Sequence, residues 1–422
     1  MMIPYGYKQT EVGVIPEDWS VDTIGAVTLS VTNGGNYKNS AQISLYPLIK
    51  MGNISRGYIN LKKIEYVIGF PPSENDRLTY GDVLLNTRNT PELVGKVAIW
   101  KNELSRAYFN SNLLRFNFKL EKSDPFFMNL IFNTEQVISE FRNIAKGTTS
   151  VAAIYPQDML KVKIIIPPLQ EQQRIAEALS DVDGMISSLE KLVAKYKSIK
   201  TACLQQMFPQ NGETVPRMRL PGFTGAWEQR KYGEVVETRR GLTYKPSDIC
   251  DSGIRVLRSS NIDEDTFVLK ADDVFVKKDA VNIDYSKEND ILITSANGST
   301  RLVGKHAIIS SISGNPAVHG GFMLLGTTKE PYFINASMGS SWYRRFIELY
   351  VAGGNGAIGN LNKNDLDNQV ILIPSEPEQR AIGAFFKQLD HLITLHQRKL
   401  EKIQKIKQGM MQQLLTGKIR LV

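Results

Sequence analysis

The longest regular pattern along the chain is a heptad spacing of apolar residues, and it occurs twice. The first run starts at Ile175 and the second at Ile382, and in both the steps between apolar positions alternate between four and three residues. This alternation is typical of a coiled-coil seam, so each run predicts one long helix. The residues expected to pair the helices are Leu179, Val182, Ile186 and Leu189 in the first run and Phe386, Leu389, Ile393 and Leu400 in the second.

A lysine occupies the eighth position of each run, Lys200 in the first and Lys407 in the second. In a parallel pair these lysines would face each other, which would bring like charges together in a poorly solvated seam. In a flush antiparallel pair, Lys407 would instead lie near Asp183, and Lys200 near Asp390. We therefore expect an antiparallel coiled coil. The alternative is that each lysine only extends along the edge of the seam into solvent.

The segments outside the two helices carry short apolar runs separated by turn residues, which is typical of β-strands. The clearest runs are residues 82–85, 162–166, 290–293 and 370–373. Helical patterns follow late in each half, at residues 126–141 and 342–351. The sequence therefore predicts mixed α/β (α+β) globular domains beside the long helices.

A long internal repeat relates the two halves of the chain. Trp19 and Asn53 recur as Trp227 and Asn261, each 208 residues later, and residues 164–172 match residues 371–379. A colinear set of this length indicates a tandem duplication. The expected domains are residues 1–166 and 209–374, each followed by one long helix, in residues 167–208 and 375–422.

Positions shared by the two copies are expected to serve the framework, whereas positions that differ can serve different targets. We accordingly interpret the shared Asn53 and Asn261 as structural turn residues. The clearest divergent segment lies between residues 82–85 and 93–96, where the offset between the copies changes from 208 to 209. A one-residue insertion of this kind is typical of a loop. In the second copy this loop covers residues 294–301.

The charge of the chain bears on what these loops contact. A formal net charge of +8 and a pI near 9.1 favour a partner that carries phosphates, although a basic protein with no special partner explains them equally. Arginine and asparagine can make paired contacts to guanine and adenine edges, and a plain polar hairpin tip is the alternative. The candidate DNA-binding residues are Asn86, Thr87, Arg88 and Asn89 in the first copy and Ser295, Asn297, Thr300 and Arg301 in the second, with Lys146, Arg239 and Arg240 as weaker phosphate candidates.

No catalytic, cofactor or metal site is expected. The two cysteines and four histidines do not combine at metal-ligand spacings. Residues 354–359 spell GxGxxG, but they follow a helical pattern and lead into a polar stretch, so their context is wrong for a dinucleotide site. The chain also lacks a P-loop, a GxSxG elbow and the Asn/Asp-Pro-Pro-aromatic motif of DNA amino-methyltransferases. It has no apolar run long enough to span a bilayer and no export-type start, so a cytoplasmic location is expected.

The junctions between domains and helices resemble those of the specificity subunit of type I restriction–modification enzymes. The most diagnostic stretch is residues 166–175, IPPLQEQQRI, followed directly by the heptad run. Residues 373–382 repeat it more loosely, with Ser375 in place of the second proline. The segments ending in Trp19 and Trp227 also resemble the starts of that family's recognition domains. The resemblance covers essentially the whole chain.

This resemblance implies two target-recognition domains joined by an antiparallel helical dimer, each reading one half of a bipartite target in double-stranded DNA. It implies assembly with two modification subunits, which carry S-adenosylmethionine and methylate adenine, and with ATP-driven restriction subunits. No cofactor is then expected on this chain itself, because S-adenosylmethionine, ATP and Mg belong to the partners. The chain would be a non-catalytic subunit, with no membrane partner.

Three other interpretations stay open at this point. A specificity-type subunit of a different restriction class would have the same sequence features, because the difference lies in the partners. A self-contained DNA methyltransferase or nuclease would need motifs that the chain lacks. The third is a coiled-coil scaffold that binds no nucleic acid, and a steep loss of DNA binding with rising salt would argue against it.

Overall fold

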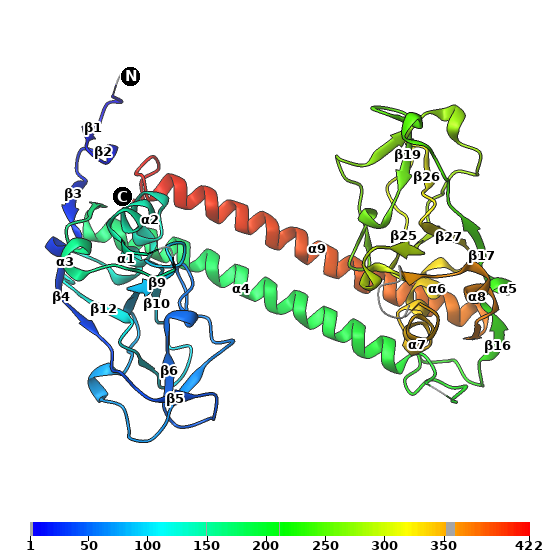
Figure 1. The fold of residues 1–422 in the computed structure, drawn as a ribbon, viewed down its shortest axis with the longest axis horizontal. Coiled ribbons are helices and arrows are strands. Elements are labelled where there is room, and N and C mark those ends of the chain that lie inside the picture. The colour runs from blue at the N-terminus through cyan, green and yellow to red at the C-terminus, as the bar shows by residue number, and fades with distance from the viewer. Residues whose placement is uncertain (1–2, 149, 211, 352–358) are drawn as a thin grey trace. The chain divides into compact units, whose positions relative to one another are not determined.

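The computed structural model describes residues 3–148, 150–210, 212–351 and 359–422. Contacts divide the chain into two compact units (Figure 1). Unit 1 consists of residues 1–188 and 400–422, and unit 2 of residues 189–399. The boundary therefore falls within both long helices, so that each unit contains one globular domain and a part of each helix. Each unit is described by itself.

The two predicted long helices are confirmed as α4 (Leu169–Gln206) and α9 (Glu376–Leu414). Pro167 and Pro168 directly precede α4, and Pro377 lies in the first turn of α9, where the missing amide hydrogen of proline costs no helical hydrogen bond. Gly417 follows α9 with a φ of +70°, a conformation that glycine adopts without strain at the end of a helix.

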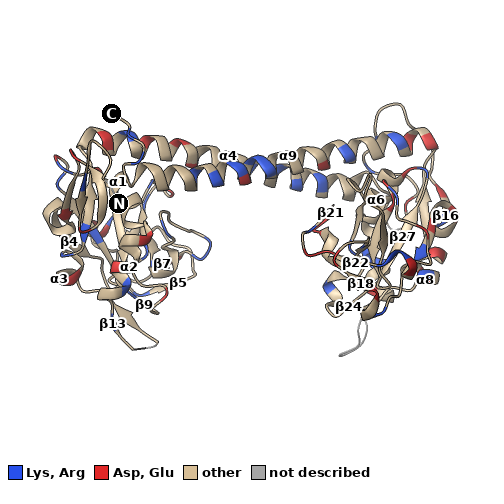
Figure 2. Cartoon of the chain, turned by 90° about the horizontal axis from the view of Figure 1, so that it is seen from above, with Lys and Arg blue, Asp and Glu red and all other residues tan. Residues whose placement is uncertain are grey.

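The helices run antiparallel within each unit. In unit 1 the Lys407 Nζ lies 2.6 Å from Asp183 Oδ1, which joins the first half of α4 to the second half of α9. In unit 2 the Lys200 Nζ lies 2.8 Å from Asp390 Oδ1, which joins the opposite halves. Both expected pairings are thus confirmed. The charges along the two helices can be followed in Figure 2.

The residues expected to pair the helices lie on their inner faces. In unit 1, Leu179 is fully buried in the domain core, while Val182, Ile186 and Leu400 are half-buried. In unit 2, Leu189, Leu389 and Ile393 are buried, and the rings of Tyr196 and His396 stack with centroids 5.6 Å apart. Phe386 packs against Phe208 in the core of unit 2, so this residue also fastens α9 to the domain.

The globular part of unit 1 is built on two four-stranded sheets with two helices. The first sheet has the order β10-β8-β12-β4 and the second β11-β6-β7-β5. Phe116 of β12 packs on Phe132 of α1, which packs on Phe141 of α2. The elements are β4 (Thr28–Asn33), β5 (Asn39–Ser40), β6 (Pro47–Ile49), β7 (Glu65–Val67), β8 (Val83–Asn86), β10 (Val97–Ile99), β11 (Tyr108–Phe109), β12 (Leu113–Phe118), α1 (Pro125–Phe132) and α2 (Glu135–Ile144).

Unit 2 repeats this topology strand for strand, which confirms the duplication. Its sheets have the orders β25-β23-β27-β17 and β26-β19-β22-β18, and the parallel pairing of β11 with β6 recurs as that of β26 with β19. The elements are β17 (Glu237–Arg240), β18 (Ile249–Cys250), β19 (Ile254–Leu257), β22 (Val274–Val276), β23 (Ile291–Thr294), β25 (His306–Ile308), β26 (Ala317–His319), β27 (Met323–Thr327), α6 (Pro331–Met338) and α7 (Ser341–Tyr350).

The predicted strands are confirmed with shifts of one residue, and each domain is closed by a strand that leads into its long helix. β15 (Lys163–Ile166) pairs with β3 (Ser20–Thr23), and β29 (Val370–Ile373) pairs with β16 (Glu228–Lys231). The helical prediction was incomplete. Residues 126–141 form parts of two helices, not one, and α6 had no counterpart in the prediction. α6 is buried along most of its length, so its apolar residues show no amphipathic period.

The shared asparagines are turn residues, as predicted. In unit 1, Asn53 Oδ1 accepts from the backbone amide of Lys50, and Asn53 Nδ2 donates to the carbonyl of Asn60. In unit 2, Asn261 makes the same two contacts, with the amide of Arg258 and the carbonyl of Val268. Both asparagines are buried, and both close a turn after the corresponding strands β6 and β19.

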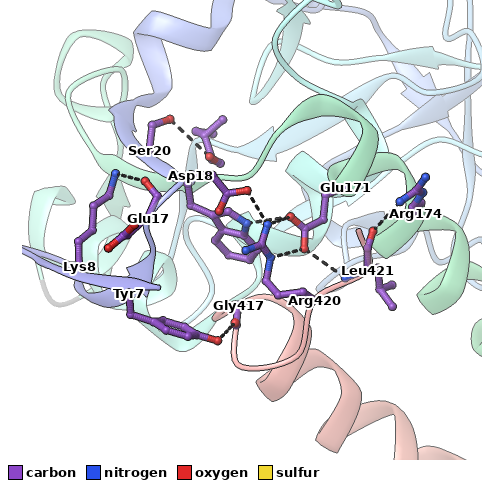
Figure 3. Close-up of polar contacts among 12 residues, drawn as sticks. Tyr7, Lys8, Glu17, Asp18, Ser20, Glu171, Arg174, Gly417, Arg420 and Leu421 are labelled. Carbon is purple, nitrogen blue, oxygen red and sulfur yellow. Dashed lines mark hydrogen bonds and ion pairs between the residues drawn. The ribbon is translucent and has the colours of Figure 1, made fainter. Parts of the chain in front are cut away.

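A buried ion pair ties the start of each long helix to its domain. In unit 1 the carboxylate of Glu171 accepts from Arg420 Nε and Nη2, both at 2.8 Å, and from Trp19 Nε1 at 2.9 Å (Figure 3). In unit 2 the matching Glu378 accepts two hydrogen bonds from Arg219, at 2.7 and 2.6 Å. Arg420 follows α9 and Arg219 follows α4, so each domain takes its arginine from the segment after the other repeat's helix.

Burial alone would raise the pKa of the Glu171 carboxyl. The hydrogen bonds donated by Arg420, Trp19 and the Leu421 amide outweigh that effect and hold the pKa below its usual value. Trp227 in unit 2 lacks this contact, because its Nε1 has no acceptor among the described residues. In unit 1 the Glu171 carboxylate thus joins Trp19, near one end of the described chain, to Arg420, near the other.

Reversing the charge of Asp183 and Asp390 together should destabilise the helix pairing. Each new lysine would face Lys407 or Lys200, and the partly exposed positions limit the cost to on the order of 1 kcal/mol per site at low salt. The double variant should unfold at a lower temperature than Asp181→Lys, an exposed neighbour on α4, and added salt should narrow the difference. Equal melting of the two variants would contradict the assigned pairing.

The Glu171 ion pair should make stability depend on acid pH. Because the folded pKa of Glu171 lies below its ordinary value of about 4.5, its contribution is complete above that pH and is lost as the pH falls further. Melting temperatures measured from pH 7 to pH 3 should fall less steeply for Glu171→Gln than for the unaltered chain. Parallel pH curves for Glu171→Gln and the unaltered chain would contradict this assignment.

Arg420→Met and Arg219→Met should each lower the free energy of unfolding by about 3 kcal/mol at pH 7, since each leaves a buried carboxylate unpaired.

Candidate nucleic-acid interface

A small sheet at the edge of each unit gathers the divergent segments. In unit 1, β9 (Arg88–Asn89) pairs with β14 (Ala152–Ala153), which pairs with β13 (Lys146–Gly147). In unit 2, β24 (Ala296–Asn297) pairs with β28 (Gly359–Asn360). Figure 2 shows β9 and β13 at the end of unit 1 away from the long helices, and β24 at the corresponding end of unit 2. The sheet brings together loops that lie about 60 residues apart.

The backbone that carries these strands is the same in both units. The amide of Thr87 donates to the carbonyl of Asn112, and the amide of its counterpart Ser295 donates to the carbonyl of Phe322. The carbonyl of Thr87 accepts from the amide of Ile154, as the carbonyl of Ser295 does from Leu361. The two units therefore share the same backbone hydrogen bonds around β9 and β24 but carry different side chains there.

Two of the predicted residues in unit 1 serve this frame. Asn86 is fully buried, donates from Nδ2 to the carbonyl of Leu93, and accepts from the amide of Arg88 at Oδ1. The Thr87 hydroxyl donates to the carbonyl of Asn112. In contrast, Arg88 is exposed and Asn89 is half-exposed on β9. The accessible candidates of this loop are therefore Arg88 and Asn89.

In unit 2 the same distinction separates the predicted residues. Ser295 is buried, whereas Thr300 and Arg301 are exposed at the start of a short 3-10 helix, Thr300–Leu302. Asn297 is half-exposed. Its Nδ2 donates to the Ser259 hydroxyl at 3.0 Å, and its Oδ1 accepts from the amide of Ser299.

The predicted phosphate-contact residues differ in whether they already form ion pairs with carboxylates of the chain. Lys146 pairs with Asp158 at 2.7 Å, and this carboxylate raises the pKa of the lysine. Arg239 lies between the buried Asp290 and the exposed Asp284, at 3.4 and 3.6 Å. Arg240 is exposed and makes no ion pair with a described residue. Its guanidinium is thus free to meet a phosphate.

Sequence reasoning missed the segments that surround these strands. In unit 2 a pocket of about 770 Å³ lies beside β24 and is lined by parts of four segments. In unit 1 a smaller groove beside β13 is lined in part by the exposed Arg142 of α2. The offset of 208 places Arg258, in the pocket of unit 2, at the position of Lys50 in the first copy, and this pairing of two basic residues was a usable signal. The pocket lining is Leu242, Thr243, Tyr244, Pro246, Ile249, Arg258, Ser259, Ser260, Ala296, Asn297, Gly298, Gly320, Gly321, Phe322 and Met323.

Among the described residues, no three His, Cys, Asp or Glu side chains gather as a metal-binding group. Both cysteines are free thiols. No described helix is long and apolar enough to cross a membrane. Within the GxGxxG motif, residues 354–358 lie outside the described part of the chain, and Gly359 belongs to β28.

A comparison with protein-family models decides the family. Residues 16–200 and 225–405 each match the model described as the type I restriction modification DNA specificity domain. The chain belongs to this family. The two matches cover both domains and most of both long helices, so the predicted duplication corresponds to two copies of one family unit.

Individual relatives agree with the family match. The specificity subunit of the type I restriction enzyme MjaVIII from Methanocaldococcus jannaschii is 23% identical over 427 residues, covering 96% of this chain and 94% of the relative. The EcoKI specificity subunit of Escherichia coli is 23% identical over 395 residues, covering 89% and 83%.

Solved structures share the fold. The S subunit of a type I restriction–modification system from M. genitalium superimposes with a TM-score of 0.65 at 15% identity, over 94% of this chain and 96% of that one. A chain from a study of complex assembly and conformational transition in the type I R-M system gives a TM-score of 0.50 at 17% identity, over 96% and 99%. Both likenesses support the predicted architecture of duplicated domains with long helices.

The family assignment confirms the predicted class of function, DNA specificity in type I restriction–modification. Specificity subunits are recognition components of these systems, so the prediction of a non-catalytic chain is supported by the family rather than by anything missing from the structure. The interpretations as a self-contained enzyme and as a scaffold without nucleic acid are thereby set aside.

Arg240 and its neighbour Arg239 provide a matched test of the interface. Arg240→Ala should weaken binding to a double-stranded oligonucleotide and make the dependence of log K on log salt less steep by about one, because one phosphate contact is lost. Arg239→Ala should instead lower the melting temperature, because it leaves Asp290 buried without its partner. Fluorescence anisotropy at several salt concentrations measures the first effect. An unchanged salt slope for Arg240→Ala would exclude it from the interface.

Proposed function

We propose that this chain is the specificity subunit of a type I restriction–modification complex, in which each domain reads one half of a bipartite DNA target. The observation that carries this proposal is the paired small sheets. Two domains with the same backbone frame present different side chains at the same edge. Two related domains that expose different side chains are suited to a DNA target made of two different half-sites.

The proposed contact residues are the accessible members of the predicted set. In the first domain these are Arg88 and Asn89, with Lys146 as a phosphate contact. In the second domain they are Asn297, Thr300 and Arg301, with Arg240 as a phosphate contact. Arginine and asparagine suit guanine and adenine edges in the major groove. Asn86 and Ser295 are buried, the Thr87 hydroxyl donates to a backbone carbonyl, and Arg239 pairs with the buried Asp290, so these four residues are not among the proposed contacts.

We assign the long helices the role of setting the spacer between the two half-sites. α4 contains 38 residues, which corresponds to about 57 Å of helix. Successive DNA reading elements on one face of the duplex lie about 34–36 Å apart, so a helix of this length is sufficient to separate two readers by more than one turn. Residues 1–166 and 209–374 are the proposed recognition domains, and residues 167–208 and 375–422 the spacer helices.

The proposed complex supplies the chemistry. Two modification subunits would dock on the helices and adjoining surfaces and would methylate adenine with S-adenosylmethionine. Restriction subunits would add ATP-driven translocation with Mg, and this chain would bind none of these cofactors. The structural neighbour comes from a study of complex assembly in the type I R-M system, and this supports assembly of the chain with partner subunits. Because the proposed target is DNA inside the cell, we propose a cytoplasmic location for the chain.

Exchange of one domain should change one half of the target. Replacing residues 1–166 by the matching domain of a relative, in a host that also expresses the modification subunits, should alter one half-site of the methylated motif. The other half-site and the spacer should stay the same. Single-molecule methylation mapping of the host genome provides the readout.

The reciprocal exchange of residues 209–374 is the control, and it should alter only the other half-site. If either exchange changed both halves, the assignment of one word to each domain would be wrong. Methylation that persists with an unaltered motif in both chimaeras would show that the domains are not the readers.

A further inference from the structure

The pocket beside β24 is lined by residues of unit 2 alone. Its volume is about 770 Å³. Four segments meet there: the chain after β17, the turn at residues 258–260, strand β24, and the chain after β26. The turn and β24 are joined directly, because Asn297 Nδ2 donates to Ser259 Oγ at 3.0 Å. The proposed reader Asn297 therefore belongs to the wall of this pocket.

Two polar groups in the pocket wall lack partners. The Arg258 Nε and the Ser260 Oγ are buried atoms with no hydrogen-bond partner among the described residues. Arg258 also makes no ion pair with a described residue, although its side chain is half-buried. A buried donor without an acceptor costs about 1–3 kcal/mol, so the pocket is prepared for a ligand that brings acceptor atoms.

The equivalent position in unit 1 is already satisfied. Lys50 stands where Arg258 stands in unit 2, and its Nζ donates to Asn39 Oδ1 at 2.8 Å and pairs with Glu65 at 2.9 Å. The same backbone frame thus carries an internally neutralised cation in one copy and an unpaired one in the other. This difference indicates that the free guanidinium serves the particular target of unit 2 rather than the fold.

An exposed aromatic ring stands beside the unpaired arginine. Phe322 lines the pocket, yet its side chain is 74% exposed. Its counterpart in unit 1 is Asn112, which holds the same backbone hydrogen bond to the loop. A large apolar side chain left in solvent at the mouth of a pocket is suited to the face or methyl group of a base. Gly298, Gly320 and Gly321 leave the rest of the wall open to close approach.

A free positive charge lies next to the pocket along the same strands. Arg240 precedes the lining residue Leu242 by two positions, and His319 precedes Gly320. Arg240 and His319 line a second, adjoining hollow of about 460 Å³ with Asn282 and Asp284. Burial lowers the pKa of His319 to about 4, so this histidine is neutral near pH 7 and adds no charge.

We infer that this pocket is the site where unit 2 reads a guanine of its half-site, with Arg258 donating to the guanine O6 and N7 and Phe322 packing on the neighbouring base. Guanine is the base that presents two acceptors at its major-groove edge, and arginine matches them with two donors. Ser260 and Asn297 would complete the contact. This inference rests on the proposed function, since it assumes that unit 2 binds one half-site.

The test uses the full chain assembled with its modification subunits and maps the methylated motif in genomic DNA. Arg258→Met should make one position of one half-site tolerant of bases other than guanine, with a loss of discrimination of about tenfold to hundredfold. Lys50→Met, the matched change in unit 1, should leave that half-site unaltered. Replacing the guanine at the tolerant position by 7-deazaguanine in an oligonucleotide should weaken binding of the unaltered chain but not of Arg258→Met.

Phe322→Ala provides a second variant that should fold, because the ring is exposed. The variant should bind the guanine-containing oligonucleotide about fivefold or more weakly than the unaltered chain does, while the melting temperature of the protein stays the same. If Arg258→Met leaves the bipartite motif unchanged and Phe322→Ala leaves oligonucleotide binding unchanged, the reading pocket is overturned and the proposed function still stands. A chain that directs no bipartite methylation at all would instead overturn the proposed function.

Discussion

Two lysines in the helix seam, Lys200 and Lys407, determine the direction in which the long helices pair. A lysine in a poorly solvated seam needs a carboxylate, and the antiparallel direction gives each of these lysines one on the opposite helix. Lys200 also pairs with Asp265 of the unit 2 domain, at 3.2 Å. Asp390 meets the first within unit 2, and Asp183 meets the second within unit 1. Because the seam positions repeat from one copy to the other, the same charge pairing occurs once in each unit.

The antiparallel direction in turn explains how each domain is completed. The start of one helix lies beside the end of the other, so the segment that follows one helix reaches the domain that precedes the other. Arg420 after α9 and Arg219 after α4 therefore meet Glu171 and Glu378, the acidic residues in the first turns of the opposite helices. The same type of glutamate–arginine pair thus occurs in both units. The arginine of unit 1 comes from the segment after α9, and the arginine of unit 2 comes from the segment after α4.

Much of the fold could be predicted from the sequence because its signals are local or periodic. The heptads, the strands at residues 82–85 and 290–293, and the asparagine turns follow from spacing and from the repeat. Helix α6 could not be predicted, since a helix buried on most sides has no polar face. The small sheets were also missed, because the pairing of β9 with β14 joins residues about 60 positions apart through backbone bonds that carry no residue signature.

The candidate site was predicted in part for the same reason. The divergent segments were identified from the repeat, but which of their side chains are accessible depends on where one strand ends and the next begins. Asn86 ends the buried strand β8 and turns inward, while Arg88 two residues later is exposed. The pocket around Arg258 combines four separate segments, so only the structure shows that an unpaired arginine, an asparagine and an exposed phenylalanine share one wall.

Single-molecule mapping of methylated bases tests whether the two unlike domains of one chain read two different half-sites. The DNA comes from a host that expresses the unaltered chain with its modification subunits. The expected result is a methylated motif made of two different specified sequences separated by an unread spacer of constant length. A continuous motif without a spacer would contradict it.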